Sequence, residues 1–208
     1  MAKFDSLIFD VDGTIWDTTP IVAPAWNEAM DICGLSYAHV TADDLKQLFG
    51  KPMDEIIARI LPDENKETRE KFKLCCYEKE EDAVGSAGGK LYPHMKETLE
   101  ALSKKYKLYV VSNCQSGYIE TMLRVTGFGP YFMDHACYGD EEKLKDENIR
   151  LIIERNGLKN AAYVGDTQGD ADATHKAGIP FIHASYGFGK NVDHAEYVIS
   201  GIKDLLNL

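Results

Sequence analysis

Two pairs of acidic residues have the spacing of a metal-dependent active site. The first pair is Asp10 and Asp12, followed by Gly13, and the second is Asp166 and Asp170. Alternate residues of an extended chain point the same way, so Asp10 and Asp12 can face one site. Carboxylates this close repel each other, and a hard divalent cation such as Mg²⁺ relieves the repulsion. The pattern predicts a magnesium site that Asp10, Asp12, Asp166 and Asp170 share.

Side chains suited to phosphate occur between these two pairs. Ser112 and Asn113 supply a hydroxyl and an amide, and Lys143 and Lys145 supply positive charge. A magnesium ion with a hydroxyl and a lysine beside it is arranged to bind a phosphoryl group. An aspartate there can attack phosphorus and form an aspartyl-phosphate, while a second carboxylate acts as an acid and then as a base. These residues predict phosphoryl transfer.

Short apolar runs alternate with amphipathic helical patterns along most of the chain. Strands are predicted at residues 3–11, 108–111, 135–138, 161–164, 181–183 and 197–199. Helices are predicted at residues 96–106, 117–125, 148–155 and 168–177. This alternation is typical of an α/β fold with a Rossmann-like, doubly wound parallel sheet. Ligands of such sheets bind beyond the carboxyl ends of the strands, where the polar residues above fall.

One segment breaks the alternation. Residues 16–87 contain no convincing strand, and their helical patterns lie at residues 20–30, 42–49, 53–61 and 66–83. We therefore expect an all-helical cap domain at 16–87, inserted into a core domain made of residues 1–15 and 88–208. The glycine-rich residues 85–89 are predicted to form its flexible return linker.

The acidic balance of the chain excludes large anionic partners. Lys and Arg total 23 against 34 Asp and Glu in 208 residues, a formal net charge of −11. Such a chain has no bulk attraction for nucleic acid or anionic lipid, and no apolar run reaches the roughly 18 residues that span a membrane. The five cysteines match no zinc or CxxC spacing, which is typical of reduced thiols. We expect a cytoplasmic protein, monomeric by default, that acts on a small phosphorylated metabolite.

Together these motifs resemble those of the haloacid dehalogenase superfamily. The four family motifs correspond to residues 10–14, Ser112-Asn113, Lys145, and Asp166 with Asp170. The resemblance covers nearly the whole chain and implies a helical C1-type cap after the first strand. Two further segments are similar to the phosphoglycolate phosphatase-like branch, and these are Gly50-Lys51-Pro52 and Tyr186-Gly187-Phe188-Gly189.

The resemblance implies a role for each matched residue. Asp10 would be the nucleophile, and Asp12 would protonate the leaving alkoxide and then activate water. The ligands of Mg²⁺ would be Asp10, the backbone carbonyl of Asp12, Asp166 and, directly or through water, Asp170. The phosphoryl group would be bound by Ser112, Asn113 and Lys145. The family thus implies a magnesium-dependent phosphatase that hydrolyses a small phosphate monoester through an aspartyl-phosphate.

Several alternatives stay open on the sequence alone. Lys143 is the second candidate for the active-site lysine. A sugar-phosphate phosphomutase of the same family has nearly the same first motif, and a non-catalytic phospho-accepting signalling module also combines acids, a hydroxyl and a lysine on a parallel sheet. In the insert, Lys51 either contacts an anionic leaving group or is solvated. Trp16 either lines the mouth of the site or packs in the core.

Overall fold

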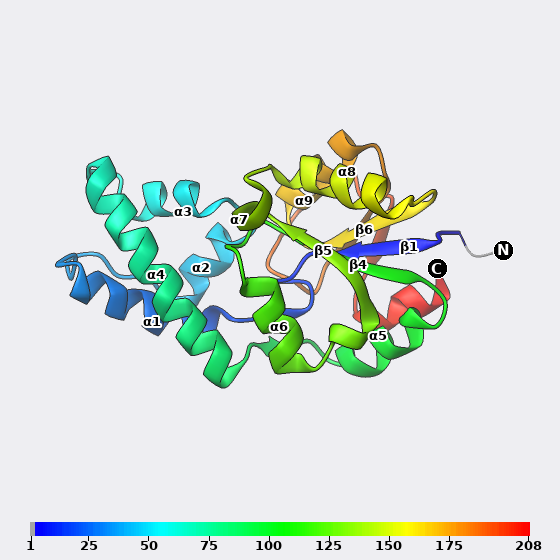
Figure 1. The fold of residues 1–208 in the computed structure, drawn as a ribbon, viewed down its shortest axis with the longest axis horizontal. Helices are drawn as coiled ribbons and strands as arrows, with labels where there is room; N and C mark the ends of the chain where they lie inside the picture. The colour runs from blue at the N-terminus through cyan, green and yellow to red at the C-terminus, as the bar shows by residue number, and fades with distance from the viewer. Residues whose placement is uncertain (1–2) are drawn as a thin grey trace.

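A six-stranded parallel sheet forms the centre of the molecule in the order β5-β4-β1-β6-β7-β8 (Figure 1). The computed structural model describes residues 3–208, so residues 1–2 of the predicted core segment 1–15 lie outside the described residues. The strands are β1 (Ser6–Phe9), β4 (Lys107–Ser112), β5 (Phe132–Cys137), β6 (Ala161–Gly165), β7 (Phe181–Ala184) and β8 (Tyr197–Ile199). The predicted doubly wound α/β sheet is confirmed.

Helices cover both faces of this sheet (Figure 1). The covering elements are α5 (Met95–Ser103), α6 (Tyr118–Thr126), η1 (Gly129–Tyr131), α7 (Tyr138–Glu141), α8 (Lys145–Asn156), α9 (Gln168–Ala177) and η2 (Ile202–Asn207). Side chains of β1 alternate between the two faces: Leu7 and Phe9 join one buried apolar cluster, whereas Ile8 joins the other. Both faces of the sheet are covered, so β1 is buried along its whole length and is apolar from Leu7 to Phe9, as is usual in parallel sheets.

Four further helices gather beyond the carboxyl ends of the strands, at one end of the molecule (Figure 1). They are α1 (Thr19–Ile32), α2 (Ala42–Leu48), α3 (Met53–Ile60) and α4 (Lys66–Ala87). The buried side chains of α4 recur at every fourth position, at Phe72, Cys76, Glu80 and Val84. This spacing puts them on one helix face, and Glu80 is its charged member. Among the helices of residues 3–208, none has the length and apolarity needed to cross a membrane.

The connections between these helices and the sheet differ from the predicted ones. The segment predicted to contain no strand begins with β2 (Trp16–Asp17), which pairs antiparallel with β3 (Lys90–Leu91). The prediction of a flexible linker at residues 85–89 is wrong, because α4 continues to Ala87. Gly88 ends the helix with a φ of 70°, and Gly89 lies flat against Trp16, where an added Cβ would be 2.6 Å from Cδ2. The entry and exit segments are therefore held together as a short ribbon.

Candidate active site

The loops after β1 and β6 lie side by side at the point where the strand order reverses. The two strands pair in register, with Phe9 opposite Val164, and the Asp10 amide donates to the Val164 carbonyl at 2.9 Å. Parallel α/β sheets bind their ligands at this reversal point. The fold therefore brings together Asp10 and Asp166, which are far apart in the sequence.

Three carboxylates form a buried cluster at this point. Asp10, Asp166 and Asp170 offer oxygens that all lie within 4.8 Å of one another. Burial raises the pKa of Asp10 to about 6, and burial together with the charges of Asp170 and Asp10 raises the pKa of Asp166 well above its ordinary value. Hard oxygen donors in mutual repulsion are a donor set that fits a divalent cation such as Mg²⁺.

Lys145, the first residue of α8, lies inside the carboxylate cluster. Its Nζ is 2.9 Å from Asp10 Oδ1 and 2.6 Å from Asp170 Oδ1, and the residue is only 4 % exposed. Burial lowers the pKa of Lys145, but the charges of Asp10 and Asp170 outweigh it and raise that pKa, so the ammonium stays charged. Lys143 instead lies half exposed beside Glu141. Of the two candidate lysines, the structure brings Lys145 to the site.

Backbone and hydroxyl donors fix the second pair of acids. Thr167 caps the start of α9, and its amide and hydroxyl both donate to Asp170 Oδ2, at 2.9 and 2.7 Å. Asp166 Oδ2 accepts from the amides of Phe188 and Gly189 at 2.6 and 3.3 Å. The loop of residues 186–189 therefore orients Asp166, a function that the sequence did not reveal.

Two glycines permit this close packing. Gly13 has a φ of 87°, and a Cβ there would lie 2.2 Å from Asp166 Oδ2. A Cβ on Gly187 would lie 2.3 Å from the Gly13 carbonyl oxygen and 2.4 Å from Asp166 Cβ. A larger residue at either position would push the first and last acidic loops apart.

The Asp12 carboxyl is not part of the cluster of three acids and is held by two hydroxyl groups. Its Oδ1 accepts from the Thr18 hydroxyl at 2.6 Å and from the Tyr118 hydroxyl at 3.0 Å. Burial raises the pKa of Asp12 to about 8, and the nearby charges of Glu80 and Asp10 add to the shift. Of the four carboxylates expected at one cation, the structure brings three together, and the Asp12 carboxyl is not among them. A contact through the Asp12 backbone carbonyl stays a prediction.

A cavity of about 50 Å³ separates these residues from the helices α1–α4. On the core side it is lined by Asp10, Asp12, Ser112, Asn113, Cys114, Gln115 and Tyr118. On the helical side it is lined by Trp26, Phe49, Gly50, Lys51, Met53, Ile56 and Glu80. Asn113 Nδ2 donates to the Gly50 carbonyl at 2.9 Å, so the loop after α2 touches the core directly.

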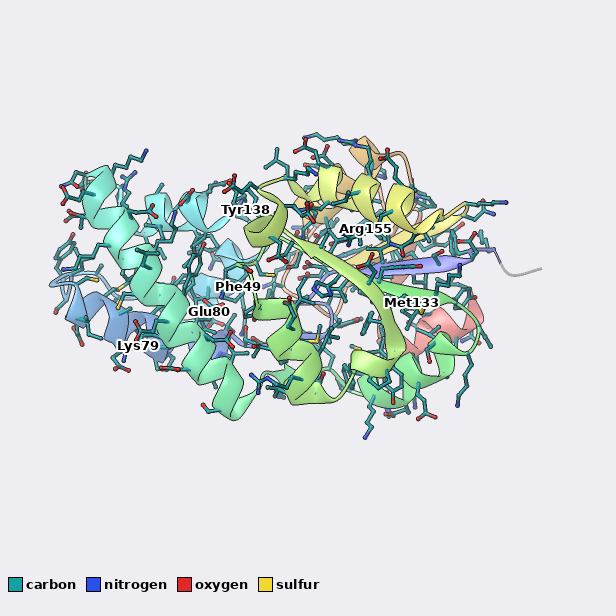
Figure 2. The ribbon with its side chains drawn as sticks, in the orientation of Figure 1. Phe49, Lys79, Glu80, Met133, Tyr138 and Arg155 are labelled. Carbon is teal, nitrogen blue, oxygen red and sulfur yellow. The ribbon has the colours of Figure 1, made fainter. Side chains whose placement is uncertain are left out.

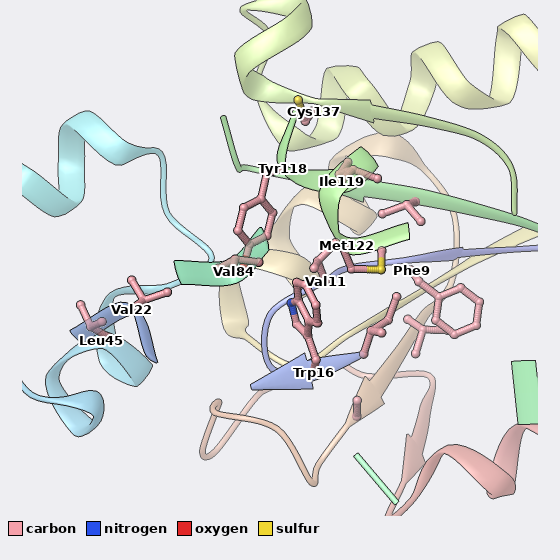
Figure 3. Close-up of a cluster of buried hydrophobic side chains, with 14 of the residues drawn as sticks. Phe9, Val11, Trp16, Val22, Leu45, Val84, Tyr118, Ile119, Met122 and Cys137 are labelled. Atoms are coloured by element: carbon pink, nitrogen blue, oxygen red, sulfur yellow. The ribbon is translucent and has the colours of Figure 1, made fainter. Parts of the chain in front are cut away.

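The two insert residues singled out by the sequence have different positions. Lys51 lines the cavity and lies 3.4 Å from Glu55, with about a third of its side chain exposed. Trp16 is fully buried and packs edge-on against Tyr118, with ring centroids 6.1 Å apart. Figure 3 shows it among Val11, Tyr118 and Met122. Of the two roles considered for Trp16, the structure supports core packing and not the mouth of the site.

Glu80 is a cavity residue that sequence reasoning missed. It belongs to α4, is 5 % exposed, and accepts hydrogen bonds from Trp26 Nε1 at 2.8 Å and Gln115 Nε2 at 3.3 Å. Figure 2 labels it near Phe49, which lines the same cavity. A signal existed in the sequence, since a single acid occupies the apolar stripe of α4. No comparable signal marked Tyr118, whose contact with Asp12 spans two distant segments.

The family model and the similar proteins that match this chain point to the same family. The family model described as haloacid dehalogenase-like hydrolase matches residues 7–184. A phosphoglycolate phosphatase from Vibrio parahaemolyticus is 26 % identical, covering 97 % of this chain and 94 % of that protein. One from Aquifex aeolicus is 30 % identical, covering 97 % and 95 %.

Solved structures show the same fold. A predicted phosphoglycolate phosphatase from Haemophilus somnus 129PT superposes with a TM-score of 0.88 at 24 % identity, covering 100 % of this chain and 98 % of that one. A haloacid dehalogenase-like hydrolase from Streptococcus pneumoniae superposes with a TM-score of 0.87 at 20 % identity, covering 100 % and 99 %. At these identities the likeness concerns the fold.

Proposed function

We propose that this chain, which belongs to the haloacid dehalogenase-like hydrolase family, hydrolyses a small phosphate monoester with Mg²⁺ through a phosphorylated Asp10. Membership of the phosphoglycolate phosphatase-like branch, and with it phosphatase activity, follows from the family match and the relatives. The metal, the intermediate and the residue roles are the proposal. A phosphatase turns over repeatedly, which sets it apart from a non-catalytic phospho-accepting module.

One observation carries the proposal: the two acids of the first pair lie in different environments. Asp10 is ion-paired with Lys145 and belongs to the cluster that fits a cation. Asp12 is turned toward the cavity, where burial raises its pKa to about 8. Neighbouring carboxyls with separated pKa values are the arrangement that divides nucleophile from general acid.

In the first step, Asp10 attacks phosphorus and the ester bond to the leaving group breaks. Asp12, protonated near neutral pH, donates its proton to the departing oxygen. Thr18 and Tyr118 hold the Asp12 carboxyl at the cavity wall, which keeps it on the leaving-group side. The product of this step is an aspartyl-phosphate on Asp10.

In the second step, Asp12 accepts a proton from a water molecule that attacks the same phosphorus. Phosphate leaves and Asp10 is restored. Mg²⁺, held by Asp10, Asp166 and Asp170 with the Asp12 carbonyl, would neutralise charge on the transferring phosphoryl group. Ser112, Asn113 and Lys145 would bind phosphoryl oxygens, and all three lie at the ends of β4 or the start of α8.

The helices α1–α4 serve in this proposal as a cap domain of residues 16–87 over a core of residues 1–15 and 88–208. Its lower surface supplies half of the cavity lining, which would shield the phosphorylated Asp10 from bulk water. Lys51 also lines the cavity, so this lysine would lie within reach of the leaving group.

The test is phosphate release from p-nitrophenyl phosphate and a panel of small phosphate esters, with Mg²⁺ and with a chelator. The proposal expects turnover that chelation abolishes and added Mg²⁺ restores. Full activity in the chelator would overturn the metal assignment. A sugar-phosphate product that requires a hexose bisphosphate would identify a phosphomutase instead.

A further inference from the structure

We propose that Glu80 selects leaving groups that donate hydrogen bonds, through hydroxyl or ammonium groups, and rejects leaving groups that carry a carboxylate. This inference rests on the proposed phosphatase function and names the substrate class of the same cavity. It predicts poor hydrolysis of a substrate such as phosphoglycolate, whose leaving group carries a carboxylate.

Glu80 is fixed where the leaving group must lie. The cavity runs from Asp10 and Asp12 to Glu80, so an ester held at Asp10 extends toward α4. The Trp26 indole donates to one Glu80 oxygen and the Gln115 amide donates to the other, which holds the carboxyl in place. A buried carboxyl with fixed partners cannot turn away from a ligand as a surface acid would.

The other polar groups near Glu80 also accept hydrogen bonds. Among the described residues, Asn113 Oδ1 is buried without a partner, although its Nδ2 is satisfied by the Gly50 carbonyl. Gln115 donates through Nε2 to Glu80, so the other polar atom of its amide is an acceptor oxygen. A leaving group with a hydroxyl or ammonium would donate hydrogen bonds to the oxygens of Glu80 and Asn113. A leaving group with a carboxylate would bring only further acceptors, and its negative charge would be repelled by Glu80.

Lys51 is the positively charged side chain that lines the cavity, and it argues for the opposite preference. Its ammonium lies 3.4 Å from Glu55, however, and about a third of the side chain is exposed. Solvent and the ion pair both weaken its attraction for an anion. Glu80, at 5 % exposure, acts in a less screened environment and therefore dominates the selection.

The small size of the cavity limits the leaving group. About 50 Å³ holds a few groups the size of water, and Trp26, Phe49 and Ile56 give it apolar walls. Because the same cavity also receives the phosphoryl group at Asp10 and Ser112, only a short leaving group fits, and a two-carbon stem places its terminal hydroxyl or ammonium toward Glu80.

The experiment compares three esters with two-carbon leaving groups, 2-hydroxyethyl phosphate, phosphoethanolamine and phosphoglycolate, at a pH well above 7, where the Glu80 carboxyl with its pKa of about 7 is ionised. We expect kcat/KM of the wild type for the first two to exceed that for phosphoglycolate by at least about tenfold. Glu80→Gln keeps the shape and the contact with Trp26 but removes the charge, and should narrow the ratio to about threefold or less. Glu78→Gln, on the exposed face of the same helix, should keep the wild-type ratio.

Wild-type preference for phosphoglycolate would overturn the inference, whatever the stability of the variants. An unchanged ratio in a folded Glu80→Gln, with a ratio altered by Lys51→Gln, would assign selection to the lysine and also overturn it. Hydrolysis of p-nitrophenyl phosphate tests the proposed function separately. If no ester were hydrolysed, the proposed function would fall and this inference with it.

Discussion

The two walls of the cavity are built on different principles. The core wall carries polar residues that follow two adjacent parallel strands, Asp10 and Asp12 after β1 and Ser112 and Asn113 at the end of β4. Asp10 is held from behind by Lys145 at the start of α8. The wall from α1–α4 is mostly apolar, and Glu80 comes from the middle of a long helix. The difference teaches that strand ends fix the chemistry, whereas helix faces are free to vary what the site accepts.

Electrostatics sharpens the same contrast. On the core wall Lys145 offsets two acids at once, so three buried carboxylates are tolerable when a cation is added. On the opposite wall, Glu80 has hydrogen-bond donors but no ion pair among the described residues. The contribution of the core acids to the free energy of unfolding should therefore depend on their charge partners, and the contribution of Glu80 should depend on pH.

Replacing the core lysine should have the largest effect on stability. Lys145→Met leaves Asp10 and Asp170 buried without their charge partner, which should lower the free energy of unfolding by about 3–5 kcal/mol. Urea unfolding without added metal measures this change. Lys143→Met, at a half-exposed side chain, should change it by about 0.5 kcal/mol or less. Equal effects of the two variants would contradict the contrast between buried and exposed lysines.

The pH dependence of stability should reveal the buried acid of the other wall. Burial raises the pKa of Glu80 from 4.5 to about 7, while hydrogen bonds from Trp26 and Gln115 lower it and Glu81 raises it further. Since the folded pKa is the higher one, the unfolded chain releases this proton first as pH rises. Stability is therefore lost between pH 4.5 and 7, by about 3 kcal/mol in all.

Glu80→Gln lacks this titration. The free energy of unfolding of Glu80→Gln, minus that of the wild type, should therefore increase by about 2–3 kcal/mol from pH 5 to pH 8. Parallel denaturant curves at the two pH values measure the gain, and Glu78→Gln serves as the exposed control. Curves that keep a constant separation would show that Glu80 titrates normally.

A smaller effect should follow from crowding the loop that holds Asp166. Gly187→Ala places a Cβ 2.3 Å from the Gly13 carbonyl oxygen, so the loop must move its amides from Asp166. We expect a loss of about 1–3 kcal/mol and a weaker response of activity to Mg²⁺. Gly201→Ala, where nothing lies within 4 Å of the new Cβ, should change neither. If the activity of Gly187→Ala depended on Mg²⁺ as that of the wild type does, the loop of residues 186–189 would not orient Asp166 for metal binding.

The core wall was largely predictable from the sequence. Apolar runs located the strands, and the strand-end rule then brought Asp10, Ser112 and Asp166 to one place. The choice between Lys143 and Lys145 needed the start of α8, which points one side chain inward and leaves the other outside. The choice depends on the exact residue at which the helix begins, and a hydrophobic pattern does not determine helix ends that closely.

The opposite wall was predictable only as a set of helices. Glu80 was missed, although it lies four residues from Cys76 and Val84 on the buried face of α4. Which cavity this face meets depends on packing against α1, where Trp26 contacts Glu80. The β2–β3 ribbon escaped prediction because two-residue strands leave no periodic pattern. Gly85 stayed helical although glycine suggested a linker, since tertiary packing outweighs a propensity of about 1 kcal/mol.

The central claim is that Asp10 is the nucleophile of a magnesium-dependent phosphatase. The most direct measurement is phosphate release from p-nitrophenyl phosphate by Asp10→Asn in the presence of Mg²⁺, with the fold checked by thermal unfolding. The amide cannot form the phosphorylated carboxylate, so kcat should fall by about a thousandfold or more. A folded Asp10→Asn that retains kcat within about tenfold of the wild type would contradict the account.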